Sequence, residues 1–320
     1  MNRFTIAIHG GAGTILKKNM TAAREAAYRK ALEDALEAGF SLLEKGRSSL
    51  DAVMAATISL EDNILFNAGK GSVFSKDKSQ EMDASVMDGK TLMAGAVSAV
   101  RNIRNPVELA YAVMTKSSHV MLNGQGAVDF AKLHGIKMEP DEYFFSQFRY
   151  DQWEKMQASD ESALDHNVNV NENPSKAEAT QDRKFGTVGA AACDQYGNIA
   201  AATSTGGMTN KQWGRIGDSS IIGAGTYANN KTCAISATGH GEMFIRAVAA
   251  YDVSCLIEYK GLSLREAMDI VVNDKLVKIE GEGGMVGVDA NGNAEMLFNC
   301  EGMYRAMRNS DGSNEIAIYK

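Results

Sequence analysis

The chain has 320 residues and a formal net charge of −7, from 33 Lys and Arg against 40 Asp and Glu. It contains no block of clustered Lys and Arg, which argues against a nucleic-acid partner, and no apolar run approaches the length of a membrane span. The N-terminus is too short in apolar residues for a secretory signal, so we expect a cytoplasmic protein. Its four cysteines lack C-x-x-C spacing and are expected to be reduced, mostly buried thiols: Cys193, Cys233, Cys255 and Cys300.

The N-terminal segment predicts a short strand over residues 4–8, followed by a turn at His9-Gly10-Gly11-Ala12-Gly13. The glycines indicate a tight bend or a close approach of the backbone to another group. No Gly-Lys-Ser/Thr follows them, which excludes a phosphate-binding loop. A plain strand-to-loop turn explains the motif as well, and a single histidine is more often a buried, hydrogen-bonded imidazole than a catalytic group.

Apolar periodicity and capping residues predict helices through most of the first half of the chain. Ser48 and Asp51 resemble a capping box, and Asn105-Pro106 supplies a cap and a first-turn proline. The expected elements are a helix over residues 21–45, a helix over 48–60, a hairpin over 80–100 that turns at Asp88-Gly89, a helical stretch over 105–133 broken near 123–124, and a helix over 141–156.

Residues 157–183 are rich in Asn, Asp, Glu, Ser and Lys and predict a flexible linker, because they cannot bury enough surface to offset their ordering entropy. Residues 184–210 then hold two runs of small and β-branched residues, which predict a β-hairpin with both faces buried. A disordered arm that leads directly into a core strand is unusual. It is explained if the chain is cut at the junction and Thr187 becomes a new N-terminus.

The chemistry of threonine gives a reason for such a cut. A Thr hydroxyl is a weak nucleophile without a base beside it, and an α-amino group can accept a proton near neutral pH. A Thr at a chain start therefore carries both functions, and Gly186 before Thr187 allows close approach to the peptide bond. The alternative is structural, since Thr favours pleated, half-buried strand positions.

The last third of the chain continues the mixed pattern. The expected elements are a glycine-rich loop over residues 205–225, a strand over 232–237, a helix from 238 to about 259, a helix from 263 to about 276, and a hairpin over 285–299. Because helices flank paired, largely antiparallel strands, we expect an α+β fold of four layers, with two sheets inside and helices outside.

Two groups of residues could carry chemistry. Thr238-Gly239-His240-Gly241 is expected at a helix start, where free N–H groups suit an oxyanion or a carboxylate, although an ordinary Thr cap explains it too. Arg215 and Asp218 lie three apart in the glycine-rich loop. Arg suits a carboxylate and Asp an ammonium, so together they would suit an α-amino-acid head, unless they form a solvated surface pair.

Several motifs together resemble one family, the plant-type asparaginase/isoaspartyl peptidases, which are N-terminal-nucleophile hydrolases. The motifs, which span the chain except the linker, are H-G-G-A-G at 9–13, F-N-A-G at 66–69, E-M-D-A-S-V-M-D-G at 81–89, G-T-V-G-A at 186–190, T-S-T-G-G at 203–207, G-R-I-G-D-S at 214–219, T-G-H-G-E at 238–242 and G-M-Y-R at 302–305. The resemblance implies an αββα sandwich that cleaves itself before Thr187. It implies an alpha subunit over 1–186, with the linker at about 157–186, and a beta subunit over 187–320 in one domain, usually as a dimer of such pairs.

The resemblance also implies hydrolysis of L-asparagine and of β-aspartyl dipeptides without a catalytic cofactor. Carried over by position, the implied roles are Thr187 as nucleophile, Thr205 as its hydrogen-bond partner, Thr238 and Gly239 as oxyanion donors, Arg215 and Asp218 as binders of the substrate head, Gly241 in the same pocket and Asn67 near the nucleophile. The loop that begins at Leu60 matches one that holds a structural sodium ion, with candidate ligands Leu60, Glu61, Asn63, Phe66, Ala68 and Lys70.

The departures from the family pattern are local: Gln212-Trp213 replaces Leu-Pro, Ser220 replaces Pro, Cys300 replaces Thr, and Lys70 puts a charge beside the ion loop. Two alternatives stay open. Glycosylasparaginase shares the nucleophile and R-x-G-D-S but has Asp-Thr at the cleavage site and lacks H-G-G-A-G. A precursor that never matures would be inactive.

Overall fold

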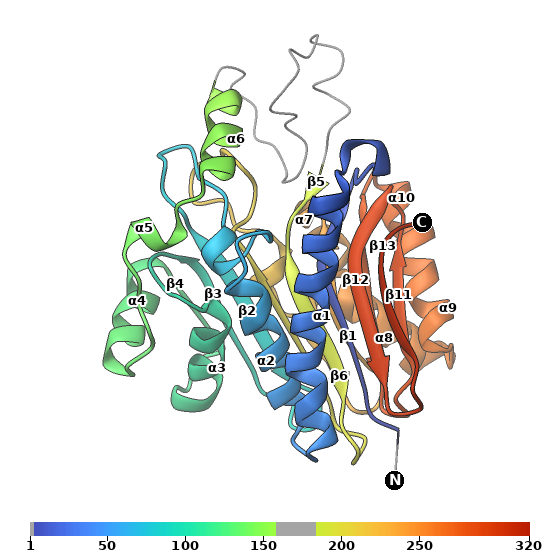
Figure 1. Ribbon diagram of the computed structural model, residues 1–320. Helices are drawn as coiled ribbons and strands as arrows, with labels where there is room; N and C mark the ends of the chain where they lie inside the picture. The colour runs from blue at the N-terminus through green and yellow to red at the C-terminus, as the bar shows by residue number, and fades with distance from the viewer. Residues whose placement is uncertain (1–2, 158–183) are drawn as a thin grey trace.

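The computed structural model describes residues 3–157 and 184–320, so the predicted linker lies outside the described residues except for Gln157. The fold is mixed α and β with two sheets (Figure 1). The large sheet has the order β13-β12-β1-β6-β7-β2-β3-β4, with β5 beside β1, and the small sheet has the order β11-β10-β9-β8. Neighbouring strands are antiparallel except β3 and β4.

The large sheet contains β1 (Thr5–Gly13), β2 (Met82–Asp88), β3 (Ala94–Val100), β4 (Met121–Asn123), β5 (Lys184–Phe185), β6 (Val188–Cys193), β7 (Ile199–Thr205), β12 (Gly302–Asn309) and β13 (Asn314–Tyr319). The small sheet contains β8 (Thr226–Ala228), β9 (Cys233–Gly239), β10 (Gly283–Asp289) and β11 (Ala294–Phe298). The helices are α1 (Ala22–Glu44), α2 (Ser49–Glu61), α3 (Pro106–Lys116), α4 (Gly124–Leu133), α5 (Asp141–Phe144), α6 (Gln147–Gln157), α7 (Gly241–Ala247), α8 (Ala249–Lys260), α9 (Leu264–Asp269) and α10 (Leu276–Lys278).

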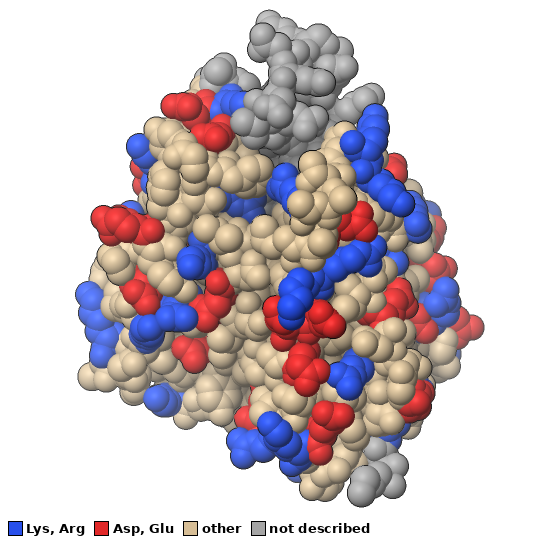
Figure 2. All heavy atoms as spheres, in the orientation of Figure 1, with Lys and Arg blue, Asp and Glu red and all other residues tan. Residues whose placement is uncertain are grey.

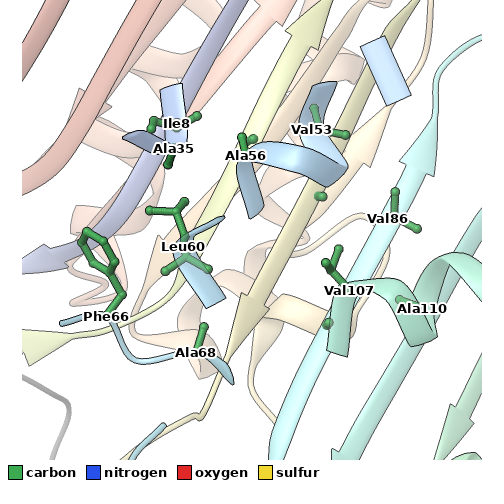
Figure 3. Close-up of a cluster of buried hydrophobic side chains, with 14 of the residues drawn as sticks. Ile8, Ala35, Val53, Ala56, Leu60, Phe66, Ala68, Val86, Val107 and Ala110 are labelled. Carbon is green, nitrogen blue, oxygen red and sulfur yellow. The ribbon is translucent and has the colours of Figure 1, made fainter. Parts of the chain in front are cut away.

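Three hydrophobic clusters hold these elements in layers. The first packs α1, α2 and α3 against one face of the large sheet, and Figure 3 shows Ala35 of α1 and Leu60 of α2 within it. The second fills the space between the two sheets with mostly small residues such as Ala191 and Ala234. The third packs α7, α8 and α9 against the other face of the small sheet. The predicted α+β class with two sheets is therefore confirmed.

The central hairpin, β6 and β7, is buried along its whole length on both faces, as its uniformly apolar runs predict. Its turn begins at Asp194, and the turn between β10 and β11 repeats the geometry at Asp289. In both turns the Asp side chain accepts hydrogen bonds from the backbone N–H groups two and four residues later. This is an Asx-type turn, which explains why the sequence D-x-x-G-N occurs twice.

Several predicted helices are interrupted in the structure. The helix expected over 141–156 is two helices, α5 and α6, separated at Phe145. The helix expected over 238–259 begins only at Gly241 and breaks at Val248, which adopts the left-handed conformation. The helix expected over 263–276 has its predicted capping box at Ser263, but a π-helical segment separates α9 from α10. In each case tertiary packing overrides local periodicity.

Other differences concern short or terminal elements. The C-terminal hairpin β12–β13 and the short strands β4, β5 and β8 were not predicted. Asn105 precedes Pro106 as expected, but its side chain donates to Asp62 instead of capping α3.

Positive and negative side chains are interspersed over the face shown in Figure 2, without a continuous stripe of one sign on the described residues there. Cys193, Cys233 and Cys300 are buried, as predicted, and Cys255 is half-buried. Within the described part of the chain, no helix is both long and apolar enough to cross a membrane.

Candidate active site

A narrow cleft lies where strands of both sheets end. Its lining consists of Gly186, Thr187, Thr205, Gly207, Arg215, Gly217, Asp218, Ser219 and Gly239. Thr187 immediately precedes β6, Thr205 ends β7 and Gly239 ends β9. Rigid strands therefore fix three sides of the cleft, while the loop between β7 and β8 supplies Arg215 and Asp218.

Thr187 is almost fully buried, and its hydroxyl is part of a short hydrogen-bond chain. Thr187 Oγ1 donates to Thr205 Oγ1 at 3.2 Å, and Thr205 Oγ1 donates to the carbonyl oxygen of Gly186 at 2.8 Å. Asn67 Nδ2 donates to the same carbonyl oxygen at 3.0 Å. The carbonyl of the Gly186–Thr187 peptide bond thus has two donors, an arrangement that stabilises negative charge on its oxygen.

Asn67 is itself held firmly. It lies in the loop after α2, is fully buried, and also donates from Nδ2 to the carbonyl oxygen of Gly207 at 2.7 Å. Its Oδ1 accepts from the backbone N–H of Val73 at 3.0 Å. The amide group is therefore fixed in the orientation that presents its N–H to Gly186.

Among the described residues, the buried polar atoms without a hydrogen-bond partner include three at or beside the cleft: Thr238 Oγ1, Asp218 Oδ2 and Ser219 Oγ. Buried polar atoms in folded proteins are nearly always paired, so such atoms at a cleft indicate a place for a polar ligand. Burial raises the pKa of the Asp218 carboxyl to about 7, although the nearby charge of Arg215 lowers it. Asp218 therefore changes charge close to neutral pH.

The Arg215 guanidinium is shared between a protein partner and the cleft. Its Nε and Nη2 donate to the two carboxylate oxygens of Glu242, each at 2.8 Å. Burial raises the pKa of Glu242, but the bonds and the charge of Arg215 outweigh this, so the net pKa is lowered. The charged Glu242 carboxylate thus holds Nε and Nη2 of Arg215, and Nη1 lies beside Gly217 and Gly207.

Gly241 lies against both head-binding candidates. A Cβ atom added there would be 2.9 Å from Arg215 Nη2 and 3.0 Å from Asp218 Oδ1. Any side chain at this position would press on the two charged groups, so glycine keeps them at their present separation.

The structure corrects the expected position of the T-G-H-G motif. Thr238 and Gly239 do not start a helix, because they are the last residues of β9 and pair with Gly284 and Gly283 of β10. The helix begins at Gly241 and has only seven residues. Donors at this edge of the cleft are therefore fixed by the sheet and not by a helix terminus.

Two glycines of the loop after α2 lie against backbone carbonyl oxygens. A Cβ atom at Gly69 would lie 2.5 Å from the carbonyl oxygen of Glu61, and one at Gly71 would lie 2.0 Å from that of Phe66. At both positions a side chain would collide with a backbone oxygen, so only glycine fits. Lys70 directs its ammonium over the Tyr143 ring, 5.2 Å from the ring centre.

The residues predicted from the sequence that line this cleft are Gly186, Thr187, Thr205, Arg215, Asp218 and Gly239. Glu242 was not predicted as the partner of Arg215. The signal was present, since Glu242 follows the T-G-H-G motif directly. An acidic residue in the first turn of a helix is ordinarily explained by the helix dipole, which gave no reason to pair it with an arginine 27 residues earlier.

Comparisons with known proteins agree over almost the whole chain. The family model described as "Asparaginase" matches residues 2–318. An "Isoaspartyl peptidase" of Salmonella typhimurium is 48% identical over 320 residues, which cover 100% of both chains. A "Putative isoaspartyl peptidase/L-asparaginase" of Dictyostelium discoideum is 44% identical over 351 residues, with 100% of both covered. The human "Isoaspartyl peptidase/L-asparaginase" is 40% identical over 293 residues, covering 91% of this chain and 88% of the human one.

Proposed function

The chain belongs to the asparaginase family, and from this premise we propose that it is a self-cleaving amidohydrolase that converts L-asparagine to aspartate and ammonia and cleaves β-aspartyl dipeptides. The observation that carries the proposal is the cleft itself. A threonine hydroxyl with a hydrogen-bonded partner faces the same small space as an arginine and a buried carboxylate. This is the set of groups that an amide attached to a free amino-acid head requires.

Maturation begins with attack of Thr187 Oγ1 on the carbonyl carbon of Gly186. The peptide C–N bond breaks, the nitrogen takes up the proton, and an ester joins Gly186 to Thr187 Oγ1 until water hydrolyses it. Asn67 Nδ2 and Thr205 Oγ1 support the negative charge that develops on the Gly186 oxygen. The products are an alpha subunit over 1–186 and a beta subunit over 187–320.

Hydrolysis then uses the new α-amino group of Thr187 as the base. It takes the hydroxyl proton as Oγ1 attacks the side-chain carbonyl of the substrate, and Thr238 Oγ1 and the Gly239 N–H donate to the resulting oxyanion. The C–N bond breaks, and the leaving amine takes the proton. Water hydrolyses the acyl-enzyme ester and releases aspartate.

Arg215 and Asp218 hold the head of the substrate in this scheme. Arg215 binds the α-carboxylate with the part of its guanidinium that Glu242 leaves open, and ionised Asp218 binds the α-ammonium. Gly241 keeps the space between them free. Because both charged groups of the head are recognised, a peptide-bonded aspartyl residue without a free amine or carboxylate is excluded.

The fold and the loop after α2 extend the proposal. Two facing sheets between two sets of helices support a four-layer αββα sandwich of the N-terminal-nucleophile type. The carbonyl oxygens of Glu61 and Phe66, each of which lies against a glycine of this loop, are the ligand type that a hard cation prefers. We assign a structural sodium ion to this loop, with Leu60, Asn63, Ala68 and Lys70 supplying further carbonyl oxygens. It would fix the loop that carries Asn67 and take no part in the reaction.

Two further expectations belong to the same proposal. We expect the mature protein to be a dimer of alpha/beta pairs, and we expect it in the cytoplasm. Sedimentation of the purified protein tests the first, since a single pair would sediment near 34 kDa, the mass of the intact chain.

The decisive experiment compares wild type with Thr187→Ala. Wild type is expected to split into two fragments, one of which begins at Thr187 by N-terminal sequencing, and to hydrolyse β-aspartyl-leucine and asparagine. Thr187→Ala is expected to stay whole, folded and inactive. Thr115→Ala, which alters an exposed threonine on α3, serves as the matched control and is expected to behave like wild type.

Two results would reject the proposal. If N-terminal sequencing finds a fragment that begins at a residue other than Thr187, then Thr187 is not the nucleophile. Cleavage of N-acetylglucosaminyl-asparagine in preference to β-aspartyl-leucine would favour the glycosylasparaginase alternative.

A further inference from the structure

His9 is the one member of the H-G-G-A-G motif with a reactive side chain, and the proposed reaction does not use it. It lies in β1, fully buried. Its Nδ1 is 3.1 Å from the backbone carbonyl oxygen of Thr187, and its Nε2 is 2.8 Å from Ser236 Oγ of β9. The imidazole therefore connects the large sheet to the small sheet directly behind the proposed nucleophile.

The partners of His9 determine where its proton lies. A carbonyl oxygen can only accept, so Nδ1 must carry the hydrogen and donate it to Thr187. Burial lowers the pKa of His9 to about 3, although the bond to Thr187 raises it, so the ring stays neutral throughout the physiological range. Nε2 is then an acceptor, and Ser236 Oγ donates to it.

Buried hydroxyl groups extend this arrangement through the interior. Ser236 Oγ lies 2.7 Å from Thr203 Oγ1, and Thr226 Oγ1 donates to Thr203 Oγ1 at 2.5 Å. Ser85 Oγ lies 2.8 Å from Thr226 Oγ1 and 2.6 Å from the carbonyl oxygen of Ser219, which follows Asp218. Because Ser236 donates its hydrogen to His9, it can only accept from Thr203, whose hydroxyl also has the Gly225 carbonyl oxygen as an acceptor at 3.2 Å. The chain is compatible with the tautomer of His9 that the Thr187 carbonyl requires.

Gly189 of β6 provides the space for the link between His9 and Ser236. A Cβ atom at this position would lie 2.0 Å from Ser236 Oγ and 2.8 Å from His9 Nε2. The contact between the ring and the hydroxyl thus depends on a glycine in the strand that begins immediately after the nucleophile.

We propose that His9 is a positioning residue for the nucleophile, and that its Nδ1–H holds the carbonyl of Thr187 so that the hydroxyl and the new amine face the cleft after cleavage. The inference rests on the proposed function. Before cleavage the peptide bond to Gly186 restrains Thr187 on its N-terminal side. After cleavage that restraint is gone, and His9 still forms a side-chain hydrogen bond to the Thr187 backbone.

The first test compares His9→Asn with His9→Leu. The Asn amide nitrogen occupies nearly the place of Nδ1 and keeps a donor for Thr187, whereas Leu keeps the volume without the donor. We expect His9→Leu to cleave itself but to lose about 10- to 100-fold in kcat with KM changed less than about threefold, and His9→Asn to retain kcat within about fivefold. His119→Leu, at an exposed position, is the control. Equal losses in His9→Asn and His9→Leu would overturn the proposal.

The second test leaves His9 unchanged and does not depend on an activity measurement. Nitrogen-15 NMR of the ring should show the tautomer with hydrogen on Nδ1, unchanged between pH 5 and 8, because the ring is neutral and locked. Gly189→Ala should alter this signal by displacing Ser236. A hydrogen on Nε2 in wild type would overturn the inference. Failure of the proposed function is distinguishable, since it would appear as a missing Thr187 fragment whatever the tautomer of His9.

Discussion

Arg215 forms a structural ion pair with Glu242 and, in the proposed function, also binds the substrate. The guanidinium has five N–H donors in a planar fork, and two of them are already directed to Glu242. Glu242 therefore fixes the plane of the fork before any substrate arrives. A ligand carboxylate then meets a group whose orientation has already been fixed, which reduces the entropic cost of binding.

Arg215→Lys is expected to be damaging although it keeps the charge. Lys lacks the planar fork, so it can satisfy Glu242 or the substrate carboxylate but not both with paired bonds. Losing such a charge-assisted bond costs about 2–4 kcal/mol, or roughly 30- to 1000-fold in kcat/KM. In the proposed scheme self-cleavage precedes substrate binding, so it should survive this substitution. Wild type should hydrolyse the substrate amidated at its α-carboxylate poorly, and equal hydrolysis of acid and amide would show that Arg215 does not bind this group.

In the proposed function, Asp218 makes substrate binding depend on pH. Its carboxyl has a pKa raised to about 7 by burial, so it is neutral below pH 7 and cannot attract the α-ammonium. The Thr187 amine, with an ordinary pKa near 7.7–8.0, must also be deprotonated to act as a base. As pH falls from 7 to 5, log kcat/KM should therefore fall with a slope near two in wild type. In Asp218→Asn, which is slower throughout, the slope should be near one, and an unchanged slope would contradict this assignment.

The parts of the candidate site whose residues lie close together in the sequence were predictable. Thr187 follows Gly186 at a recognisable junction, and Arg215 and Asp218 are three residues apart. The supporting contacts were not predictable, because Ser236 is 227 residues from His9 in the chain and meets it only when the two sheets pack. Thr238 was expected at a helix start, since nothing local distinguishes its strand end from a cap.

The two D-x-x-G-N turns form a natural comparison at the scale of elements. Both Asp side chains accept from the backbone N–H groups of their own turn. Asp194 is also fully buried and accepts from the backbone N–H of Ser49 at the first turn of α2, at 3.3 Å. The turn of the central hairpin therefore also caps a helix on the neighbouring layer, whereas Asp289 serves its own turn.

Asp194→Ala is accordingly expected to cost more than Asp289→Ala. Removing Asp194 leaves three backbone N–H groups without their acceptor, one of them at a helix N-terminus, and should lower the free energy of unfolding by about 2–3 kcal/mol. Asp289→Ala affects a more exposed turn and should cost about 1 kcal/mol. Both are measured by urea unfolding in the uncleaved Thr187→Ala background. Equal costs would mean that the link between Asp194 and α2 contributes nothing.

Turns and two serine caps were predicted well, because each depends on a few adjacent residues, whereas Asn105 does not cap α3 as predicted. Ser48 and Ser263 cap their helices as expected. The breaks at Phe145 and Val248 were missed, since apolar periodicity continues through them. Val248 adopts a φ of 49°, an unfavourable conformation for a β-branched residue, so packing of α7 and α8 on the small sheet must hold it there.

At the scale of the whole molecule, the large sheet interleaves the two segments on either side of Thr187. Across the sheet, β13 and β12 come after Thr187, β1 before it, β6 and β7 after it, and β2, β3 and β4 before it. The boundary between the segments therefore crosses the sheet three times, at β12–β1, β1–β6 and β7–β2. No local reading of the chain could give this order, because it arises from pairing between distant strands.

The cleaved pair is expected to behave as one cooperative body. Separating the fragments would expose the edges of β1 on both sides, of β7 and of β2, together with the apolar clusters that they share, so dissociation requires unfolding.

Mature enzyme should elute as an undivided species in size-exclusion chromatography at nanomolar concentration. Heating should give a single transition in which both fragments lose structure together. The uncleaved Thr187→Ala chain is the control for both measurements. It should also elute as one species and unfold in one thermal transition, although at a different temperature. Release of either fragment under native conditions, or two separate transitions in the mature enzyme alone, would show that the interleaved sheet does not hold the halves together.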